Sequence, residues 1–463
     1  MRIVPALLSG LAALIAGCET PVLRSEVDVP GSFTAAAQSE SAPDVAWWEG
    51  FGDPVLTDLI QRAARENRDV RIAAERVRAA RAGETIRRSA MLPNIDASVS
   101  AVDNDPRGAP AFESGSAGLG VSWEIDLAGG LRAGASAATY ERIATEGGAR
   151  GVRLLVLTDV ATNYFTLVGA LRQLETVRAI SAAQDETLRL ISARHRVGLA
   201  SKFDVERART AASSTQAEIP PLETLVAVSR HRIAVLIGDQ ASNATKAVAP
   251  WSGTTVLPDV QPGQPATLLE RRPDLLASRA QLEAANFRRR EAAAEWFPRL
   301  FVNALFGRQD VEMNGVDFGA ARFTNASALL AMPIFNWGRT KAINEVAESR
   351  QREALLRYED AIVRALEDVE NALVALRDER HRADALQSAA DSADAALTRA
   401  QALYDRGQID LLPLLDAQRS RLGARIGAND SSTQLYLASV QLFKALGGGW
   451  EKFEPVSSEG EPS

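Results

Sequence analysis

The sequence predicts a mainly α-helical fold with a small β part, and three observations lead to this class. One order of elements occurs twice along the 463 residues, and two very long stretches carry a heptad pattern. In each copy, two short segments alternate in polarity as strands do. Together these patterns predict long helices packed as coiled coils, with four strands per chain, rather than a compact globular domain.

The duplication is visible as a match between two distant segments. RDVRIAAERVRAARAGETIRRSAMLPNIDASVSA, from Arg68, aligns with PDLLASRAQLEAANFRRREAAAEWFPRLFVNALF, from Pro273, at a constant offset of 205 residues. Further along the chain the offset becomes 209, so that Gly198 falls on Gly407. The order of elements agrees over nearly the whole chain, which indicates two copies of one unit.

The repeat sets the predicted domain organisation. The first structural repeat covers 53–240 and the second covers 266–449, and each reads helix, β-hairpin, long helix, helix. The hairpins are expected at 94–125 and 299–334. A loop-rich linker at 241–265 joins the two repeats. The acidic stretch at 450–463 is expected to be a disordered tail.

Two seams of apolar or small residues at spacing seven predict the long helices. The stronger seam, in the second copy, consists of Leu355, Ile362, Val369, Leu376, Ala383, Ala390, Leu397 and Tyr404. The weaker seam, in the first copy, consists of Val160, Leu167, Leu174, Ser181, Leu188 and His195. A helix carrying such a seam would extend about 100 Å at ~1.5 Å per residue. A soluble coiled coil is the alternative, but it would not explain the segments between the helices.

Those segments have an alternation of period two. The candidate strands are 94–101 and 117–125 in the first copy, and 299–307 and 324–334 in the second. Polar loops at 103–116 and 308–323 are expected to join them. Strands of about 9–11 residues with one apolar face are what an outer-membrane barrel requires, although two solvent-exposed hairpins would alternate in the same way.

Aromatic residues and the need for closure favour the membrane interpretation. The junctions between strands and helices carry Trp123, Trp296, Trp337, Phe297 and Phe335, where an interfacial belt would lie. Strand edges cannot face lipid, so four strands must combine with other copies. Two chains would give a filled eight-strand barrel and three would give twelve strands with a lumen. We therefore expect internally duplicated, long coiled-coil helices plus four membrane strands per chain, which would close a 12-strand β-barrel as a homotrimer.

The N-terminus predicts export and a lipid anchor. MRIVPALLSGLAALIAGC has one basic residue, an apolar run too short to span a bilayer, and the only cysteine, Cys18. IAGC resembles the lipobox of bacterial lipoproteins, which implies a covalent diacylglycerol and an N-acyl lipid on Cys18. We expect a signal peptide at 1–17 and a lipidated tether at 18–52, and the alternative is an ordinary signal with a chance cysteine. Beyond Cys18 we expect no apolar run of the length that a membrane helix needs.

The remaining composition offers little for catalysis or nucleic-acid binding. A net charge of -7 argues against nucleic acid as a partner. The only histidines are His195, His231 and His381, which lack the spacing of a metal site, and His195 is expected to pack in the seam. No catalytic motif is present, so we expect neither catalytic residues nor a metal, and no cofactor besides the lipid on Cys18.

The order of motifs resembles that of the TolC-type outer-membrane efflux proteins, in particular the NodT-like lipoprotein branch that serves resistance-nodulation-division (RND) pumps. The motifs are WWEGFGDPVLTDLI at Trp47, SWEIDLAGGLRA at Ser122, LLERRPDL at Leu268, MPIFNWGRTKA at Met332 and LLPLLDAQRS at Leu411. The resemblance implies a trimer with a twelve-strand barrel in the outer membrane and a helical barrel in the periplasm. An equatorial domain, to which the linker 241–265 would belong, surrounds the helices.

The resemblance also implies a function and partners. Such proteins conduct small molecules or drugs passively, receiving them from an inner-membrane RND transporter through a periplasmic adaptor protein. Alternatives are a type I secretion outer-membrane duct, a periplasmic coiled-coil structural lipoprotein, and an envelope enzyme for which we find no polar constellation. The chain would lie in the cell outer membrane, in contact with its lipid.

In this family the LLDAQ segment of the second copy carries a periplasmic gate, which corresponds here to Leu412 and Asp416. Three carboxylates around a narrow axis would repel one another and favour cations, and a ring of leucines could gate by dewetting. Pro413 stands where some members carry another acid, so a double ring of aspartates is not expected. The alternative is that Asp416 lies at a helix start and pairs with a neighbouring arginine.

Overall fold

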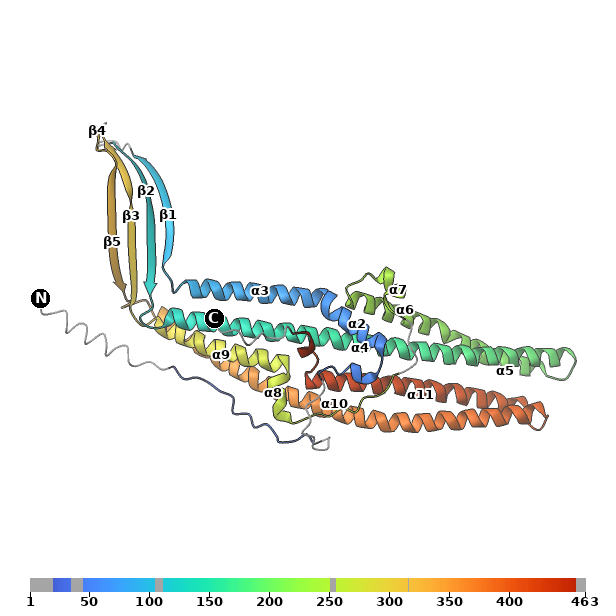
Figure 1. Cartoon of the computed structure of the whole chain (residues 1–463). Helices are drawn as coiled ribbons and strands as arrows, with labels where there is room; N and C mark the ends of the chain where they lie inside the picture. The colour runs from blue at the N-terminus through green and yellow to red at the C-terminus, as the bar shows by residue number, and fades with distance from the viewer. Residues whose placement is uncertain (1–19, 35–44, 105–110, 250–254, 315, 455–463) are drawn as a thin grey trace. The chain divides into compact units, whose positions relative to one another are not determined.

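The computed structural model describes residues 20–34, 45–104, 111–249, 255–314 and 316–454 (Figure 1). These residues are mainly helical, and their β part is one antiparallel sheet, as predicted. The chain divides into two compact units, and each unit combines segments of both sequence repeats. The first unit comprises Met1–Val27, Glu75–Gly148 and Asp274–Ala361, and the second comprises Asp28–Ala74, Ala149–Pro273 and Ile362–Ser463.

The first unit contains the sheet and the helical segments next to it in sequence. Its strands are β1 (Asn94–Asn104), β2 (Phe112–Ile125), β3 (Arg299–Met313), β4 (Val316–Asp317) and β5 (Ala321–Ala331). Its helices are α9 (Pro273–Ala294) and parts of α3 (Arg68–Ser89), α4 (Gly130–Arg196) and α10 (Arg339–Asp405). The helices α4 and α10 have 67 residues each, as the heptad pattern predicts.

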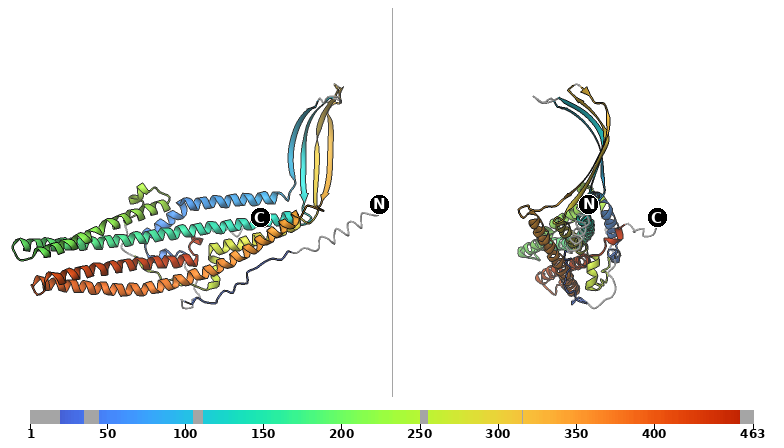
Figure 2. Two further views of the ribbon diagram at one scale, coloured as in Figure 1. Left: turned by 180° about the vertical axis from the view of Figure 1, so that it is seen from behind. Right: turned by 90° about the vertical axis from the view of Figure 1, so that its left-hand side faces the viewer.

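The four long strands lie in the order β1, β2, β3, β5, all antiparallel, and the right-hand view of Figure 2 shows that they curve. The predicted loops 103–116 and 308–323 are wrong in extent, because β2 begins at Phe112 and β3 continues to Met313. Polar residues of those segments still pair across strands, as Glu113 does with Glu312. Ladder hydrogen bonds therefore extend the strands beyond the apolar alternation that revealed them.

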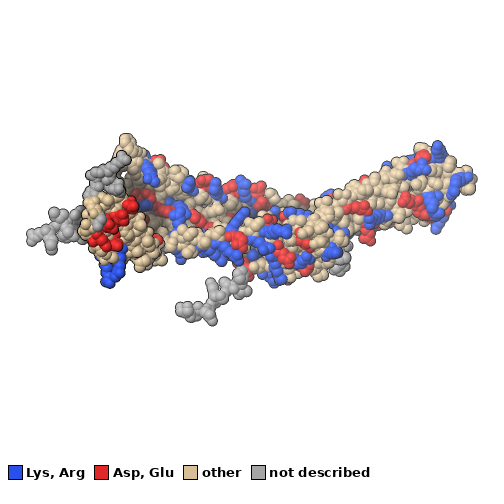
Figure 3. Space-filling model, turned by 90° about the horizontal axis from the view of Figure 1, so that it is seen from above, with Lys and Arg blue, Asp and Glu red and all other residues tan. Residues whose placement is uncertain are grey.

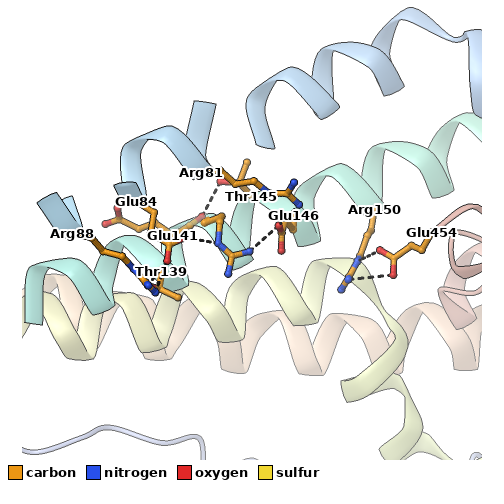
Figure 4. A network of polar contacts seen from close by, with 10 residues as sticks. Arg81, Glu84, Arg88, Thr139, Glu141, Thr145, Glu146, Arg150 and Glu454 are labelled. Atoms are coloured by element: carbon orange, nitrogen blue, oxygen red, sulfur yellow. Dashed lines mark hydrogen bonds and ion pairs between the residues drawn. The ribbon is translucent and has the colours of Figure 1, made fainter. Parts of the chain in front are cut away.

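Helix contacts in the first unit combine small residues with an acid–base network. At Gly147 an added Cβ would lie 3.0 Å from the Cβ of Ala277, so this glycine allows α4 and α9 to approach closely. Between α3 and α4, Glu84 accepts hydrogen bonds from Thr139 and from Arg142, at 2.9 and 2.6 Å (Figure 4). Burial, the largest single influence, raises the pKa of Glu84, but these hydrogen bonds and the neighbouring arginines together hold that pKa below its usual range.

The second unit has a large aromatic core around the start of the first repeat. Its further helices are η1 (Glu49–Phe51), α2 (Pro54–Glu66), α5 (Lys202–Ala217), α6 (Ile219–Leu236), η2 (Ala241–Asn243), α7 (Ala244–Ala247), η3 (Pro265–Thr267), α8 (Leu268–Arg271), α11 (Leu411–Leu446) and η4 (Glu451–Phe453). Trp47 stacks on Phe443 with ring centroids 5.1 Å apart, and Phe51 is fully buried against Phe165. This core explains why the WWEGF stretch is so rich in aromatic residues. The prediction of a disordered tail from residue 450 is wrong for its first residues, because Trp450 is buried and Phe453 stacks on Trp48.

Asp53 connects this core to two other segments. Its carboxylate caps α2 by accepting from the backbone of Val55 and Leu56, and it also accepts from the hydroxyl groups of Tyr164 and Thr255. Burial, followed by the contact with the carboxylate of Asp53, raises the pKa of Tyr164 far above its usual range. A buried carboxylate satisfied by four donors holds α2, α4 and the segment at Thr255 together.

The two heptad seams are buried or half-buried, with one exception. Val160, Val369 and Ala390 are fully buried, whereas His195, predicted to pack in the first seam, is exposed. That prediction is wrong because α4 ends at Arg196 and the imidazole Nδ1 lies 2.8 Å from the carbonyl oxygen of Ala200 in the following turn. The seam therefore stops one heptad earlier, at Leu188.

One expectation about membrane helices is also corrected. Contrary to the expectation for the chain beyond Cys18, α4 contains an 18-residue window long and apolar enough to cross a membrane, with a mean hydropathy of 1.5. However, 67% of that window is buried within the chain. This burial is typical of a core helix, and residues such as Leu157 and Phe165 pack inside the second unit.

Candidate functional site

The sheet of the first unit has one strongly apolar face. Residues paired across the strands form four successive rows on it, which are Ile125, Leu300 and Leu330; Trp123, Val302 and Ala328; Ile95, Val121, Ala304 and Ala326; and Ala97, Leu119, Phe306 and Thr324. Ile95, Leu119 and Phe306, which belong to these rows, are 68%, 54% and 48% exposed. So large an exposed apolar face requires a cover.

The dimensions of this face fit a membrane. Four rows along a strand span about 20 Å at ~3.4 Å per residue, which approaches the apolar band of outer-membrane barrels. The opposite face is more polar, with a shallow hollow of about 290 Å³ lined by Asp96, Ser122, Asn303, Asn325 and Ser327. An apolar face backed by a polar one is the pattern of a strand pair between lipid and water.

Aromatic side chains stand where the strands meet the helices. Trp123 donates from its indole Nε1 to the carbonyl of Met91 at 3.0 Å, while Trp296 and Trp337 are 51% and 91% exposed. Phe335 packs edge-on against Trp337, with ring centroids 5.0 Å apart. The structure therefore places the predicted belt residues at one end of the apolar rows, where tryptophan prefers to lie in a membrane.

The sheet has two open edges among the described strands. β1 pairs with β2, and β5 pairs with β3, so that one side of β1 and one side of β5 carry no further strand. Unpaired backbone groups are costly in lipid. The sheet is thus incomplete as a membrane-spanning structure in a single chain.

The two helix reversals of the second unit share a glycine-based stop. Gly198 and Gly407 have φ of 81° and 69°, a left-handed conformation that favours glycine. The amide of Gly198 donates to His195, and that of Gly407 donates to Tyr404. The alignment of Gly198 with Gly407 in the sequence is therefore also a structural equivalence.

A small core and one polar contact join the two reversals. Ile191, Val205, Ala208, Tyr404, Leu411 and Leu414 form a buried cluster from α4, α5, α10 and α11. Arg194 donates to the hydroxyl oxygen of Tyr404 at 3.0 Å, and its guanidinium lies over the same ring at 5.0 Å from the centroid. The two reversals are consequently packed as one tip within the chain.

The predicted gate residues lie on α11, next to the second reversal. Leu412 is 51% exposed, and the carboxylate of Asp416 is exposed and pairs with the guanidinium of Arg419 at 2.6 Å. In the single chain, Asp416 therefore has the arginine partner that the alternative interpretation expected. It lies in the second turn of α11, because the helix begins at Leu411 and its N-cap is Asp410.

The acids of the first reversal are part of local helix structure. Asp204 completes a capping box with Ser201, whose hydroxyl accepts from the amide of Asp204 at 3.1 Å. Glu206 pairs with Arg209 at 2.9 Å. The acids at the two reversals therefore have different partners, although their positions in the repeats are similar.

Cys18 lies outside the described residues, but the chain just after it is held by two buried amide side chains. Asn286 exchanges two hydrogen bonds with the backbone of Leu23, and Gln351 donates to the carbonyl oxygen of Pro21 at 2.8 Å. Asn286 and Gln351 are 3% and 2% exposed, and they also bond to each other. Within the described ranges, no group of three or more His, Cys, Asp or Glu residues is arranged to hold a metal ion.

Proteins of known family resemble this chain in sequence and in structure. The pattern of the outer membrane efflux protein family matches residues 59–239 and 265–448. The chain belongs to this family. It is 33% identical to the outer membrane protein OprJ of Pseudomonas aeruginosa over 90% of this chain and 89% of OprJ. It is 29% identical to the probable outer membrane lipoprotein SilC of Salmonella typhimurium over 94% of this chain and 97% of SilC.

A solved structure supports the same assignment. The open state of the MtrE outer membrane channel of Neisseria gonorrhoeae matches with a TM-score of 0.83 and 26% identity, over 93% of this chain and 98% of MtrE. The chain is therefore an efflux protein of the outer membrane, as its motifs predicted. This family consists of outer-membrane efflux proteins rather than enzymes.

Several residues important to this efflux protein were not anticipated from the sequence. The buried contact of Asp53 with Tyr164 joins residues 111 positions apart, and only the fold reveals it. Asp394, on α10, accepts from Arg421 and Arg425 on α11 and holds the second helix pair together. The capping box at Ser201 is different, because Ser followed three residues later by an acid could have been recognised.

Proposed function

We propose that three copies of this chain form a passive channel through the outer membrane in a tripartite efflux system. The observation that carries the proposal is the sheet, which combines one apolar face with two open edges. Copies joined edge to edge would satisfy the backbone of β1 and β5, and three copies would supply twelve long strands. Twelve strands leave a lumen, and the polar faces would line it.

Exposed apolar side chains on the helices of the first unit support lateral association. Ile86 on α3 is 69% exposed, and Val346 and Leu356 on α10 are 50% and 65% exposed. Large apolar side chains on long helices with heptad seams are typical of helix surfaces that pack against another copy. Association through these helices would continue the closure of the sheet into a helical barrel.

The proposed partners are a periplasmic adaptor protein and an inner-membrane RND transporter, and the proposed cargo is small molecules or drugs. Family membership and the full-length similarity to OprJ and SilC support this assignment. The channel itself would perform no chemistry, and the transporter would supply the energy. We find no observation that favours the alternative of a protein-secretion duct.

We also propose that Cys18 carries a diacylglycerol and an N-acyl lipid. The IAGC sequence supports this site, and the relative SilC is described as a probable outer membrane lipoprotein. Metabolic labelling of the full chain with radioactive palmitate should label the wild type and leave Cys18→Ser unlabelled. Equal labelling of both proteins would exclude this attachment site.

We retain Leu412 and Asp416 as the proposed periplasmic constriction. Both side chains are exposed beside the reversal that begins α11, where symmetry-related copies could approach. Leu412→Ala and Asp416→Ala should each raise the conductance of single trimers in planar bilayers. Unchanged conductance in both variants would show that the constriction lies elsewhere.

The central test is to measure the oligomer and its conductance directly. The purified full chain should migrate as a heat-sensitive trimer and conduct ions in planar bilayers. Co-expression with an RND transporter and its adaptor, in cells lacking their own outer-membrane channel, should restore resistance to small toxic molecules. A soluble monomer after removal of the lipid would instead support a structural lipoprotein, and export of a protein substrate alone would support a secretion duct.

A further inference from the structure

The apolar rows of the sheet end in a pair of arginines. In the row that follows Leu119 and Phe306, Arg308 on β3 lies directly opposite Arg322 on β5. Alternation along β3 places Arg308 on the same face as Phe306, because the two residues are two positions apart. The arginines therefore border the apolar band at the end away from Trp123 and Trp337.

Two like charges directly opposite each other destabilise a strand pair. Within the described part of the chain, neither guanidinium lies within ion-pair distance of a carboxylate. The nearest acid in register on this face is Asp310, two positions further along β3, and beyond it Glu113 pairs with Glu312. Figure 3, which looks onto the strand tips, shows basic and acidic side chains gathered in separate patches at this end of the sheet.

We propose that Arg308 and Arg322 form a binding site for the phosphate groups of membrane lipids whose headgroups border the apolar band. This proposal rests on the membrane position of the sheet given above. A phosphate shared by two guanidinium groups would receive bidentate hydrogen bonds and remove the repulsion between them. The acyl chains of the same lipid would lie along Leu119 and Phe306.

The position of the site favours a lipid over a free anion. The arginines lie in the row directly beyond Leu119 and Phe306, so a bound phosphate would lie about 7 Å from those two apolar side chains. Lipid phosphates lie at that distance from their acyl chains, whereas a free anion gains nothing from the apolar rows. The acids Glu113 and Glu312 stand further out and repel a phosphate, which restricts it to the level of the arginines.

The test compares lipid binding by the full-length protein in detergent. The probe is bisphosphorylated lipid A, titrated beside the same lipid without phosphates and detected by native mass spectrometry. The wild type should bind the phosphorylated lipid about tenfold more tightly than the other lipid. Arg308→Gln with Arg322→Gln should lose this preference, and the double lysine variant should keep about a third of it, because lysine retains charge without the bidentate fork.

The matched control is Arg299→Gln, at the other end of β3, where the arginine already pairs with Glu295 at 2.6 Å. This variant should keep the full preference for the phosphorylated lipid. A preference that survives in the double glutamine variant would overturn the proposal. So would competition by inorganic phosphate at equal phosphate concentration, which would indicate a simple anion site.

Channel measurements separate this inference from the proposed function. The double glutamine variant should still form trimers and conduct in bilayers of neutral lipid, because neither arginine lies in the proposed constriction. A conducting protein without lipid preference would reject the phosphate site alone. A wild type that neither trimerises nor conducts would reject the proposed function first.

Discussion

The two helix reversals share a backbone geometry but are stabilised in different ways. The first reversal has a capping box between Ser201 and Asp204, whereas the N-cap of the second, Asp410, accepts no capping hydrogen bond from the described residues. The second helix pair has an acid–base bridge instead, from Asp394 to Arg421 and Arg425. At the equivalent offset the first copy has Asp185, Ala212 and Gln216, which cannot form that bridge.

This difference shows how a duplicated unit can diverge while its shape persists. The glycine stop sets the chain direction in both copies, and side chains then distribute the stability differently. Local capping fixes the first reversal, while the second depends on contacts between α10 and α11. The copy that carries the proposed constriction is thus the one whose reversal depends less on local capping.

The largest expected effect comes from the core that both reversals share. Leu414 is 1% exposed in that cluster, so Leu414→Ala should destabilise the tip by about 3 kcal/mol. Hydrogen exchange should accelerate at the ends of all four helices. Acceleration confined to α10 and α11 would show that the reversals are independent and would break the comparison.

The next largest effect concerns the bridge of the second copy. The hydrogen bond from Arg425, opposed by burial and aided by Arg421, holds the pKa of Asp394 below its usual range. A lowered pKa stabilises the fold above the unfolded value of about 4 and loses that effect as the pH falls through the folded pKa. Asp394→Asn should cost about 1.5 kcal/mol at pH 7 and remove the acid-dependent loosening of α10 and α11.

The control for this prediction is Asp185→Asn, at the equivalent position of the first copy. This substitution should leave the protection of the α4 and α5 amides against hydrogen exchange close to that of the wild type at each pH, because Ala212 and Gln216 offer Asp185 no arginine partner. Equal effects of the two substitutions would mean that the bridge is not the source of the pH dependence.

A smaller effect should distinguish the two caps directly. Ser201→Ala removes the capping box and should cost about 1 kcal/mol at the start of α5. Asp410→Ala should cost far less, because no capping hydrogen bond is lost. Amide exchange in the first turns of α5 and α11 measures both, and a larger effect at Asp410 would reverse the comparison.

The smallest effect is expected for the contact between the reversals. Tyr404→Phe removes the hydrogen bond from Arg194 but keeps the ring and its cation–π contact. The cost should be about 0.5 kcal/mol, visible as slightly faster exchange at the end of α4. Tyr404→Leu, which also removes the ring, should cost more, and equal effects would show that the hydroxyl dominates.

The sequence predicted the elements whose patterns are local and periodic. Heptads revealed α4 and α10, and alternation revealed β1, β2, β3 and β5, because each pattern follows from the geometry of one element. Strand ends were misjudged, because the pairing of Glu113 with Glu312 depends on register between distant segments. The burial of His195 was misjudged for a related reason, because the heptad pattern does not show that α4 ends just before Gly198.

The residues of the candidate site could likewise be located from the sequence, whereas their contacts could not. Family motifs located Leu412 and Asp416, but only the fold shows that Arg419 already pairs with Asp416. The pairing of Arg308 with Arg322 requires knowledge of which strands are neighbours. Contacts between residues far apart in sequence remain outside the reach of periodicity.

The amide pair of Asn286 and Gln351 has a consequence for the order of assembly. Gln351 holds the backbone at Pro21, three residues after Cys18. A lipid attached to Cys18 would therefore lie within about 10 Å of this held segment. A chain anchored by this lipid would meet its copies by diffusion in the plane of the membrane, at a fixed depth and with little freedom to tilt. The contacts of Asn286 and Gln351 would thus hold the copies in one orientation before their open strand edges pair.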